Sequence, residues 1–262
     1  LIGTQINFRE GDIIGKLPIF ATTENGYSNL TKLSSASYLE IDGVTDPYCN
    51  LDQLIKNSEG LVILSGSTYD FFGQLFKMNK IEIINNIFKK LSAKFKDNFY
   101  LELQRHNEIG EKDYENFLID TSIKFDLPLI ASQEIFYINQ DMAEAHDALI
   151  CVGEKRFVDE VNRKRYKNNH YLKTSKEIEK LFEDLPEALQ NNYNFPKKFH
   201  FKPKKTKPKL PNINLEKDST VDSELELQAY QGLKNRLENF IYVKNKNKDK
   251  EKIKKIYEDR LG

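Results

Sequence analysis

The sequence predicts an α/β fold in which short apolar strands alternate with longer amphipathic helices. Residues 60–66, 99–103 and 127–131 are apolar runs of strand length, and residues 74–95 and 111–125 carry apolar side chains near helical spacing. This alternation is typical of βαβ units and a parallel sheet. Continuously apolar strands indicate that both faces of the sheet are covered. We therefore expect a closed or nearly closed α/β barrel, with an open doubly wound sheet as the alternative.

Further helices are expected after the last of these strands. Residues 143–152 have a helical pattern, whereas residues 153–173 are polar and basic and predict a surface loop. Thr174 stands three positions before Glu177, which is the spacing of a capping box, so a helix is expected from there to residue 185. The proline that follows is expected to begin the next helix, because proline is favoured in the first turn.

A lysine- and proline-rich segment interrupts this pattern. Residues 202–211 contain three prolines and five lysines. Such a segment cannot continue a helix and favours an extended chain. Beyond it, residues 221–241 predict an amphipathic helix and residues 244–261 a highly charged one. The chain is therefore expected to divide near residue 202.

The composition excludes several classes of protein. The 262-residue chain has 40 basic and 40 acidic side chains, and this balance argues against a general polyanion-binding protein. Residues 201–262 nevertheless carry 16 basic against 10 acidic side chains. No apolar run approaches the roughly 18 residues that span a bilayer, and no secretory signal is visible, so we expect a cytoplasmic protein with no membrane partner. Cys49 and Cys151 are too few for a disulfide framework.

Three side chains at the carboxyl ends of predicted strands are the best candidates for chemistry, because α/β folds place their sites there. Glu102 and His106 follow one strand, and Glu134 follows the next. They could converge on a metal ion or act as acid and base. The alternative that residue types favour is that they only close hydrogen bonds at the rim of the sheet. His146 is expected to pack or cap within its helix, and His170 is expected to be solvated.

A basic stretch offers a second candidate site. Residues 155–173 are rich in lysine and arginine, and Tyr166 and Tyr171 are interleaved with them. Such a stretch could bind nucleic-acid phosphates, and a solvated loop is the equally weighted alternative. The candidate phosphate contacts are Arg156, Arg163, Lys164, Arg165 and Lys167.

Several segments, in order along the chain, resemble the motifs of one known family. They are residues 25–30 (NGYSNL), 59–66 (EGLVILSG), 100–106 (YLELQRH), 130–137 (IASQEIFY), 145–152 (AHDALICV), 182–189 (FEDLPEAL) and 257–261 (YEDRL). On these motifs the sequence resembles, over nearly its whole length, the amino-terminal PHP (polymerase and histidinol phosphatase) domain of bacterial DNA polymerase III α subunits.

The resemblance implies a distorted, TIM-like PHP barrel of about seven strands, followed by a helical extension that enters the palm. It divides the chain into an N-terminally truncated PHP domain at residues 1–201, a linker at 202–220 and the start of the palm at 221–262. Both chain ends are read as cuts within a longer polypeptide. The parent would be a DNA-directed DNA polymerase, a nucleotidyltransferase, with Mg in its palm. This fragment lacks the palm carboxylates, so we expect no catalytic residues, no cofactor and no activity in it alone.

The resemblance also implies that the metal site of the family is degenerate here. Gln5 replaces a carboxylate, Lys16 a histidine and Ser67 a cysteine. Of the family's Asp-x-His pair, Glu134 could still bind a metal, but Phe136 cannot and is expected to plug the vacated space. Clustered divalent metals need several carboxylate or imidazole ligands at close range. We therefore expect no metal site and a role as a structural and interaction platform.

Partners follow from the same resemblance. They are the remaining palm, thumb and fingers of the parent subunit, a proofreading exonuclease subunit, and primer–template DNA through the parent. Two other functions stay open. One is a metal-dependent phosphoesterase or 3′–5′ exonuclease with a rearranged site on Glu102, His106 and Glu134. The other is a basic nucleic-acid-binding module that uses the loop at 155–173 and the lysine-rich linker.

Overall fold

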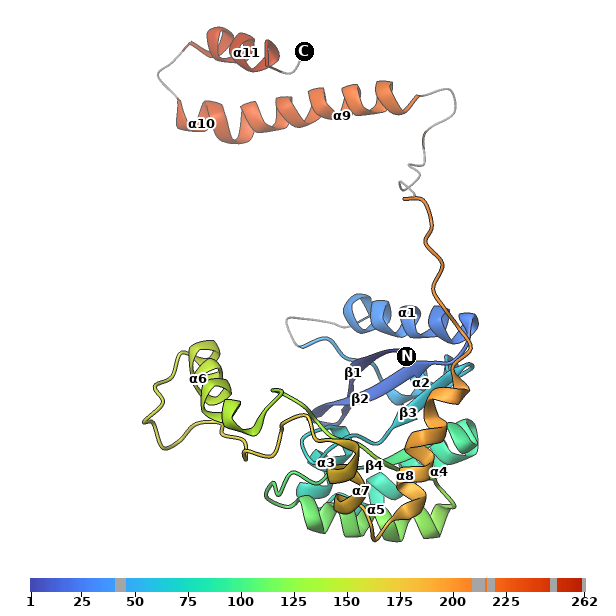
Figure 1. Cartoon of the computed structure of the whole chain (residues 1–262). Coiled ribbons are helices and arrows are strands. Elements are labelled where there is room, and N and C mark those ends of the chain that lie inside the picture. The colour runs from blue at the N-terminus through green and yellow to red at the C-terminus, as the bar shows by residue number, and fades with distance from the viewer. Residues whose placement is uncertain (41–45, 209–214, 216–219, 246–248, 261–262) are drawn as a thin grey trace. The chain divides into compact units, whose positions relative to one another are not determined.

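The structure is a computed structural model that describes residues 1–40, 46–208, 215, 220–245 and 249–260. The chain divides into two compact units, Leu1–Pro203 and Lys204–Gly262, and Figure 1 shows the elements of each. Among the described residues, no helix is long and apolar enough to cross a membrane.

The first unit is built on a five-stranded sheet in the order β1-β2-β3-β4-β5. The first three strands are joined antiparallel, whereas β3, β4 and β5 run parallel to one another. The three strands expected from apolar runs are therefore confirmed as the parallel part of the sheet. The strands are β1 (Ile2–Glu10), β2 (Ile13–Ala21), β3 (Leu61–Leu64), β4 (Phe99–Leu103) and β5 (Leu129–Ala131).

The sheet does not close into the expected barrel of about seven strands. Its two edges, β1 and β5, are not paired with each other in the described part of the chain. After β5 the sequence turns polar, and the chain continues as loops and helices instead of further sheet strands. The described residues therefore form an open, mixed α/β sheet, which is closer to the alternative that the sequence left open.

Helices cover the sheet and connect its parallel strands (Figure 1). The expected helix at 111–125 is confirmed, but the one at 74–95 is two helices. Asn79 has a φ of 56°, and this left-handed residue ends α3 in the manner of a C-cap, with its amide bonded to Phe76 O at 2.8 Å. The helices are α1 (Glu24–Leu39), α2 (Leu51–Lys56), α3 (Phe71–Lys77), α4 (Ile81–Phe95), α5 (Glu111–Phe125), α6 (Ala143–Glu154), α7 (Ser175–Leu181) and α8 (Pro186–Asn194).

The caps expected from the sequence form. Thr174 and Glu177 make a reciprocal capping box at the start of α7, and Pro186 begins α8. The helix α7 ends at Leu181, earlier than expected, and the free Leu181 carbonyl accepts a hydrogen bond from Arg105 Nη1 at 2.5 Å. The next residue, Phe182, is fully buried. The end of α7 thus contacts the residue segment just after β4.

Apolar side chains pack on both faces of the sheet, as the continuously apolar strands predict. In β3, Leu61 and Ile63 point into the larger core, whereas Val62 and Leu64 point into a smaller one, because successive strand residues face opposite sides. The smaller core is completed by Phe195, whose ring lies 5.4 Å from that of Tyr100.

The start of α1 lies directly against the turn before β3. A Cβ atom added to Gly26 would lie 2.0 Å from Gly60 O. One added to Gly60, which has a φ of 70°, would lie 2.2 Å from Thr23 Oγ1. Both positions therefore require glycine, Gly26 for close approach and Gly60 for its backbone conformation as well.

The second unit is helical and has little buried surface. Its elements are α9 (Val221–Arg236), a π-helical turn (Leu237–Ile241), α10 (Tyr242–Lys244) and α11 (Lys250–Glu258). Of its described residues, only Leu237 is buried. Residues 202–208 form no regular element, as expected of the lysine- and proline-rich segment, and residues 209–211 lie outside the described part.

Candidate functional site

The polar side chains singled out in the sequence gather near the carboxyl ends of β3, β4 and β5. Glu102, in β4, is buried, and its Oε1 accepts hydrogen bonds from Ser132 Oγ at 2.5 Å and Gln104 Nε2 at 3.0 Å. Its backbone amide donates to Ser65 Oγ at 2.8 Å. Burial raises the pKa of Glu102, and the bonds from Ser132 and Gln104 oppose that rise. Glu102 thus links the ends of β3 and β5 to β4, through its backbone amide to Ser65 and through its carboxyl group to Ser132.

His106 uses both ring nitrogens within the protein. Its Nε2 accepts a hydrogen bond from the Glu134 amide at 3.1 Å, and its Nδ1 lies 3.3 Å from Glu111 Oε1. Because an amide N–H can only donate, the hydrogen-bond network assigns the neutral ring's proton to Nδ1. The His106 amide also donates to Glu111 Oε2 at 2.7 Å. With 2% of its side chain exposed, His106 has no free nitrogen for a ligand.

His170 is buried, which corrects the expectation that it is solvated. Its ring stacks on that of His106 with centroids 4.2 Å apart and an angle of 1°. Its Nδ1 lies 3.1 Å from Glu134 O and its Nε2 lies 3.3 Å from Glu108 Oε1. Burial, and then the nearby His106, lower the pKa of His170. A backbone bridge between Tyr137 and Tyr171 brings this segment against the site, and no local sequence pattern reveals it.

Phe136 lies among aromatic rings. Its centroid is 4.7 Å from that of His170, 4.8 Å from that of His146 and 4.8 Å from that of Tyr166. Its backbone amide donates to His170 O at 2.9 Å. The ring is partly buried. His146 is therefore packed, as the sequence indicates. Phe136 fills the space between α6 and the returning loop, which is the segment at residues 155–173.

The other positions expected to have lost metal ligands do not join into one cluster. Gln5 and Lys16 are exposed on the β1–β2 hairpin. Ser67 donates through both its amide and its Oγ to Asp70 Oδ2, each at 2.8 Å. Burial and Asp70 raise the pKa of Glu134, against an opposing effect of His106, Lys164 and Lys16.

Glu102, His106 and Glu134 lie at the same end of the sheet, but their side chains do not converge. Glu134 contacts His106 through its backbone amide, whereas Glu102 bonds to Ser132 and Gln104. Within the described ranges, no group of three or more His, Cys, Asp or Glu side chains has the geometry to hold a metal ion.

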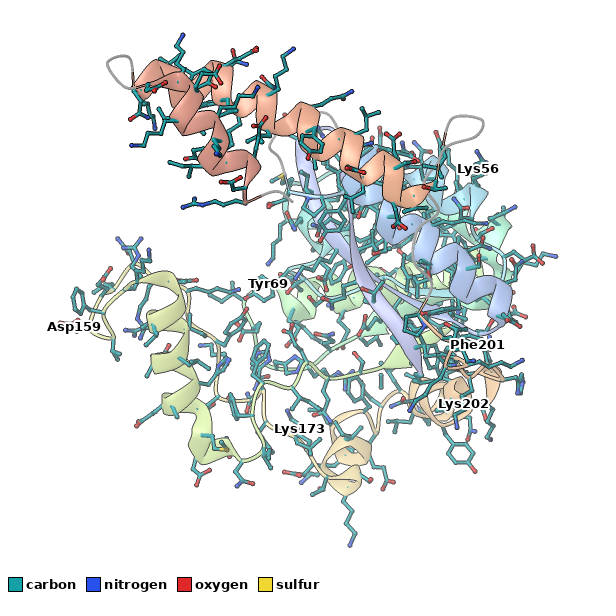
Figure 2. All side chains as sticks on the ribbon, turned by 90° about the horizontal axis from the view of Figure 1, so that it is seen from above. Lys56, Tyr69, Asp159, Lys173, Phe201 and Lys202 are labelled. Atoms are coloured by element: carbon teal, nitrogen blue, oxygen red, sulfur yellow. The ribbon has the colours of Figure 1, made fainter. Side chains whose placement is uncertain are left out.

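The basic loop after α6 is ordered by its own arginines. Arg163, with 2% of its side chain exposed, donates to both carboxylate oxygens of Asp147 at 2.5 Å, and these bonds lower the pKa of Asp147. Arg165 donates to Val158 O at 3.0 Å, and Arg156 to Glu160 at 2.8 Å. In Figure 2, Asp159 marks the tip of this loop, away from the sheet.

Of the five candidate phosphate contacts, Arg163 is thus fully engaged by Asp147. Arg156 and Arg165 are partly engaged. The two lysines differ from them. Lys164 lies over the Tyr166 ring at 4.8 Å, and Lys167 is exposed. The loop is therefore a folded structure in which arginine side chains bind protein groups.

Two residues important to the site, Glu108 and Tyr69, are not marked by any sequence pattern. Glu108 accepts hydrogen bonds from the Lys167 amide at 2.7 Å and from Tyr69 Oη at 3.1 Å, in addition to facing His170. It therefore ties the loop after β3 and the returning loop to the end of β4. Burial and then Glu108 raise the pKa of Tyr69 to about 12. Figure 2 places Tyr69 and Lys173 on opposite sides of this region.

Known proteins resemble the chain across most of its length. Residues 1–106 match the PHP domain family. The DNA polymerase III subunit alpha of Caulobacter vibrioides is 35% identical over 222 residues, which are 85% of this chain and 19% of that protein. The proteins of the same name from Rickettsia bellii and Pseudomonas aeruginosa are 30% and 28% identical over 90% and 95% of this chain, and 20% and 21% of their own lengths.

The chain spans about one fifth of the length of these curated relatives. The match to the PHP family covers β1 to β4 and ends at His106. The matches to the polymerase subunits extend well beyond that point, over 222 to 250 residues. The resemblance read from the sequence motifs is thus confirmed, and this chain is related over most of its length to bacterial DNA polymerase III α subunits, with a PHP domain match in its first 106 residues.

Proposed function

We propose that this chain is part of the α subunit of a bacterial replicative DNA polymerase, and that its PHP domain is a metal-free platform. Its relatives are named DNA polymerase III subunit alpha, and its first 106 residues match the PHP family. The domain would occupy residues 1–201, followed by a linker at 202–220 and the start of the palm at 221–262. The parent would synthesise DNA in the cytoplasm with Mg bound in its palm.

The packing of Phe136 is the observation that supports a platform most directly. A ring stands where the family has a metal-binding histidine, and it packs on His146, His170 and Tyr166. A phenyl ring offers no lone pair to a metal ion, and this one contributes apolar contacts that hold the loop after α6 against the body of the domain. At this position, aromatic packing thus replaces the metal binding of the family's histidine.

The neighbouring polar groups support the same proposal. His106 is fully hydrogen-bonded by Glu111 and the Glu134 amide. Lys16 acts electrostatically on Glu134, and a fixed cation there would repel a dication. Among the residues that the structure describes, the side chains that remain are too few and too separated for a two- or three-metal centre.

Metal analysis of the parent subunit tests this proposal. Protein purified from cells grown with added Zn and Mn should hold less than stoichiometric metal after gel filtration. A matched control restores the family ligands together, as Gln5→Glu, Lys16→His, Ser67→Cys, Glu134→Asp and Phe136→His, and should raise the metal content. One or more tightly held metals in the unaltered subunit, with hydrolysis of a 3′ end that Glu102→Gln abolishes, would instead establish the phosphoesterase.

The platform role predicts partners that can be tested separately. In the parent, the domain would contact the palm, thumb and fingers and a proofreading exonuclease subunit, and would reach primer–template DNA through the parent. The nucleic-acid-binding alternative predicts direct, steeply salt-dependent DNA binding by this chain. Because Arg163 is engaged by Asp147, the part of the loop in that binding would depend mainly on the exposed Lys164 and Lys167, and charge reversal of both should weaken it. Unchanged, weak binding supports the platform.

A further inference from the structure

Two buried oxygen atoms near the carboxyl end of β4 make no hydrogen bond of normal geometry in the structure, although the Ser65 side chain lies near enough to one of them, Tyr114 Oη, to oppose the burial that raises its pKa. The two atoms are Glu102 Oε2 and Tyr114 Oη, and their residues are 7% and 3% exposed. Nearly all buried polar atoms in proteins are hydrogen-bonded to protein or to ordered water. An unpaired carboxyl oxygen and an unpaired hydroxyl in the same region therefore point to a missing partner.

Both residues line the same small cavity. It has a volume of ≈ 10 Å³ and lies between the end of β4, the loop after β3 and the helix α5. Its wall also includes the polar residues Ser67, Thr68 and Gln104. A space of about 10–15 Å³ is the minimum for one water molecule, which needs two to four polar partners. The cavity meets both conditions and is too small for a hydrated cation.

We propose that this cavity binds a single water molecule that bridges Glu102 Oε2 and Tyr114 Oη. Water both donates and accepts hydrogen bonds, so it serves the hydroxyl and the carboxyl oxygen at once, whether or not the carboxyl carries a proton. The two side chains do not bond to each other directly, since neither of these atoms makes a hydrogen bond of normal geometry. The water joins β4 to α5 at the point where the polar network meets the core.

The bound water assigns Glu102 a purely structural part. Its Oε1 already accepts from Ser132 and Gln104, and the water occupies Oε2. Both carboxyl oxygens then have buried partners, which would have to be displaced before either oxygen could bind a metal. This inference is independent of the proposed function of the parent.

A crystal structure of this chain at about 1.5 Å or better tests the proposal directly. It should show one isolated density peak within hydrogen-bonding distance of both Glu102 Oε2 and Tyr114 Oη. An empty cavity, or a direct hydrogen bond between the two side chains, would overturn the proposal.

Two tyrosine variants give a second test, in which the change in melting temperature depends on whether the water is present. With the water present, Tyr114→Phe removes a satisfied hydroxyl and should lower the melting temperature. Without it, the same change removes an unpaired buried hydroxyl and should leave the melting temperature unchanged or raise it. Tyr137→Phe is the matched control, because Tyr137 Oη is also buried and makes no hydrogen bond of normal geometry, but does not line this cavity. Equal effects of the two variants would contradict the proposal.

Discussion

Arg105 is expected to be one of the most important single side chains for the stability of the first unit. Its guanidinium donates to Glu115 at 2.8 and 2.9 Å and to Asp184 at 2.6 and 2.8 Å. It also lies 4.6 Å from the centre of the Phe182 ring. The side chain therefore connects β4, α5 and the segment between α7 and α8.

The two carboxylates differ in burial, and this difference sets how much stability is lost when Arg105 is removed. The Glu115 side chain is 3% exposed, whereas that of Asp184 is 57% exposed. Arg105→Ala leaves a buried carboxylate with only Lys112, itself 72% exposed, as a partner. Removing one member of a buried ion pair costs about 3–5 kcal/mol. We expect that loss in the free energy of unfolding.

Urea unfolding at pH 7, followed by circular dichroism, measures the effect. Asp184→Ala is the matched control and should cost only ~0.2–1 kcal/mol, because its pair with Arg105 is largely exposed. The double variant Arg105→Met, Glu115→Leu should recover most of the loss, since apolar side chains can replace a buried pair. If Arg105→Ala costs no more than Asp184→Ala, the reasoning from burial is wrong.

Three further outcomes are expected. Phe136→Ala should lower the free energy of unfolding by about 1–3 kcal/mol, less than for a fully buried phenylalanine, because the ring is partly buried. Phe136→His should cost less and should not create nuclease activity. An unchanged melting temperature of the alanine variant would show that the ring does not fill a packed space. Amide hydrogen exchange should be faster after residue 212 than in β3 and β4, because only Leu237 is buried among the described residues of the second unit; equal protection would contradict this. Burial tends to raise the pKa of Glu115, but hydrogen bonds from Arg105 and Lys112 outweigh it and lower that pKa from its usual 4.5. The ionised Glu115 therefore stabilises the fold above pH 4.5, and this contribution is lost as the pH falls. The stability difference between the unaltered chain and Arg105→Ala should therefore shrink in acid, and a constant difference from pH 7 to pH 3 would refute the assignment.

The parallel part of the fold could be predicted because its signal is local. The strands β3, β4 and β5 are continuous apolar runs, and α5 has the expected bounds, since its apolar spacing lies between clear turn residues. The strand β1 has no such signal. In β1 only Ile6 and Phe8 are buried, and its other side chains are polar or partly exposed, so the segment does not stand out from a surface loop.

The site was predictable only in part, because its contacts are between distant segments. Glu102, His106 and Glu134 were found from their positions after strands. The burial of His170 depends on the pairing of Tyr137 with Tyr171, which are 34 positions apart in the sequence. The role of Glu108 depends on a loop that returns about 60 residues later. The break at Asn79 was missed because the apolar spacing continues through it from Leu75 to Ile84.

The contact between Gly26 and Gly60 explains why two of the motifs that identify the family need not belong to a site. These glycines belong to two of the sequence motifs, residues 25–30 and 59–66, which are distant in the chain but form one contact. Any larger side chain at Gly26 would collide with the backbone of Gly60. The restriction comes from the shape of the main chain and is independent of any ligand. Folding alone therefore requires glycine at these two positions, whatever chemistry the domain performs.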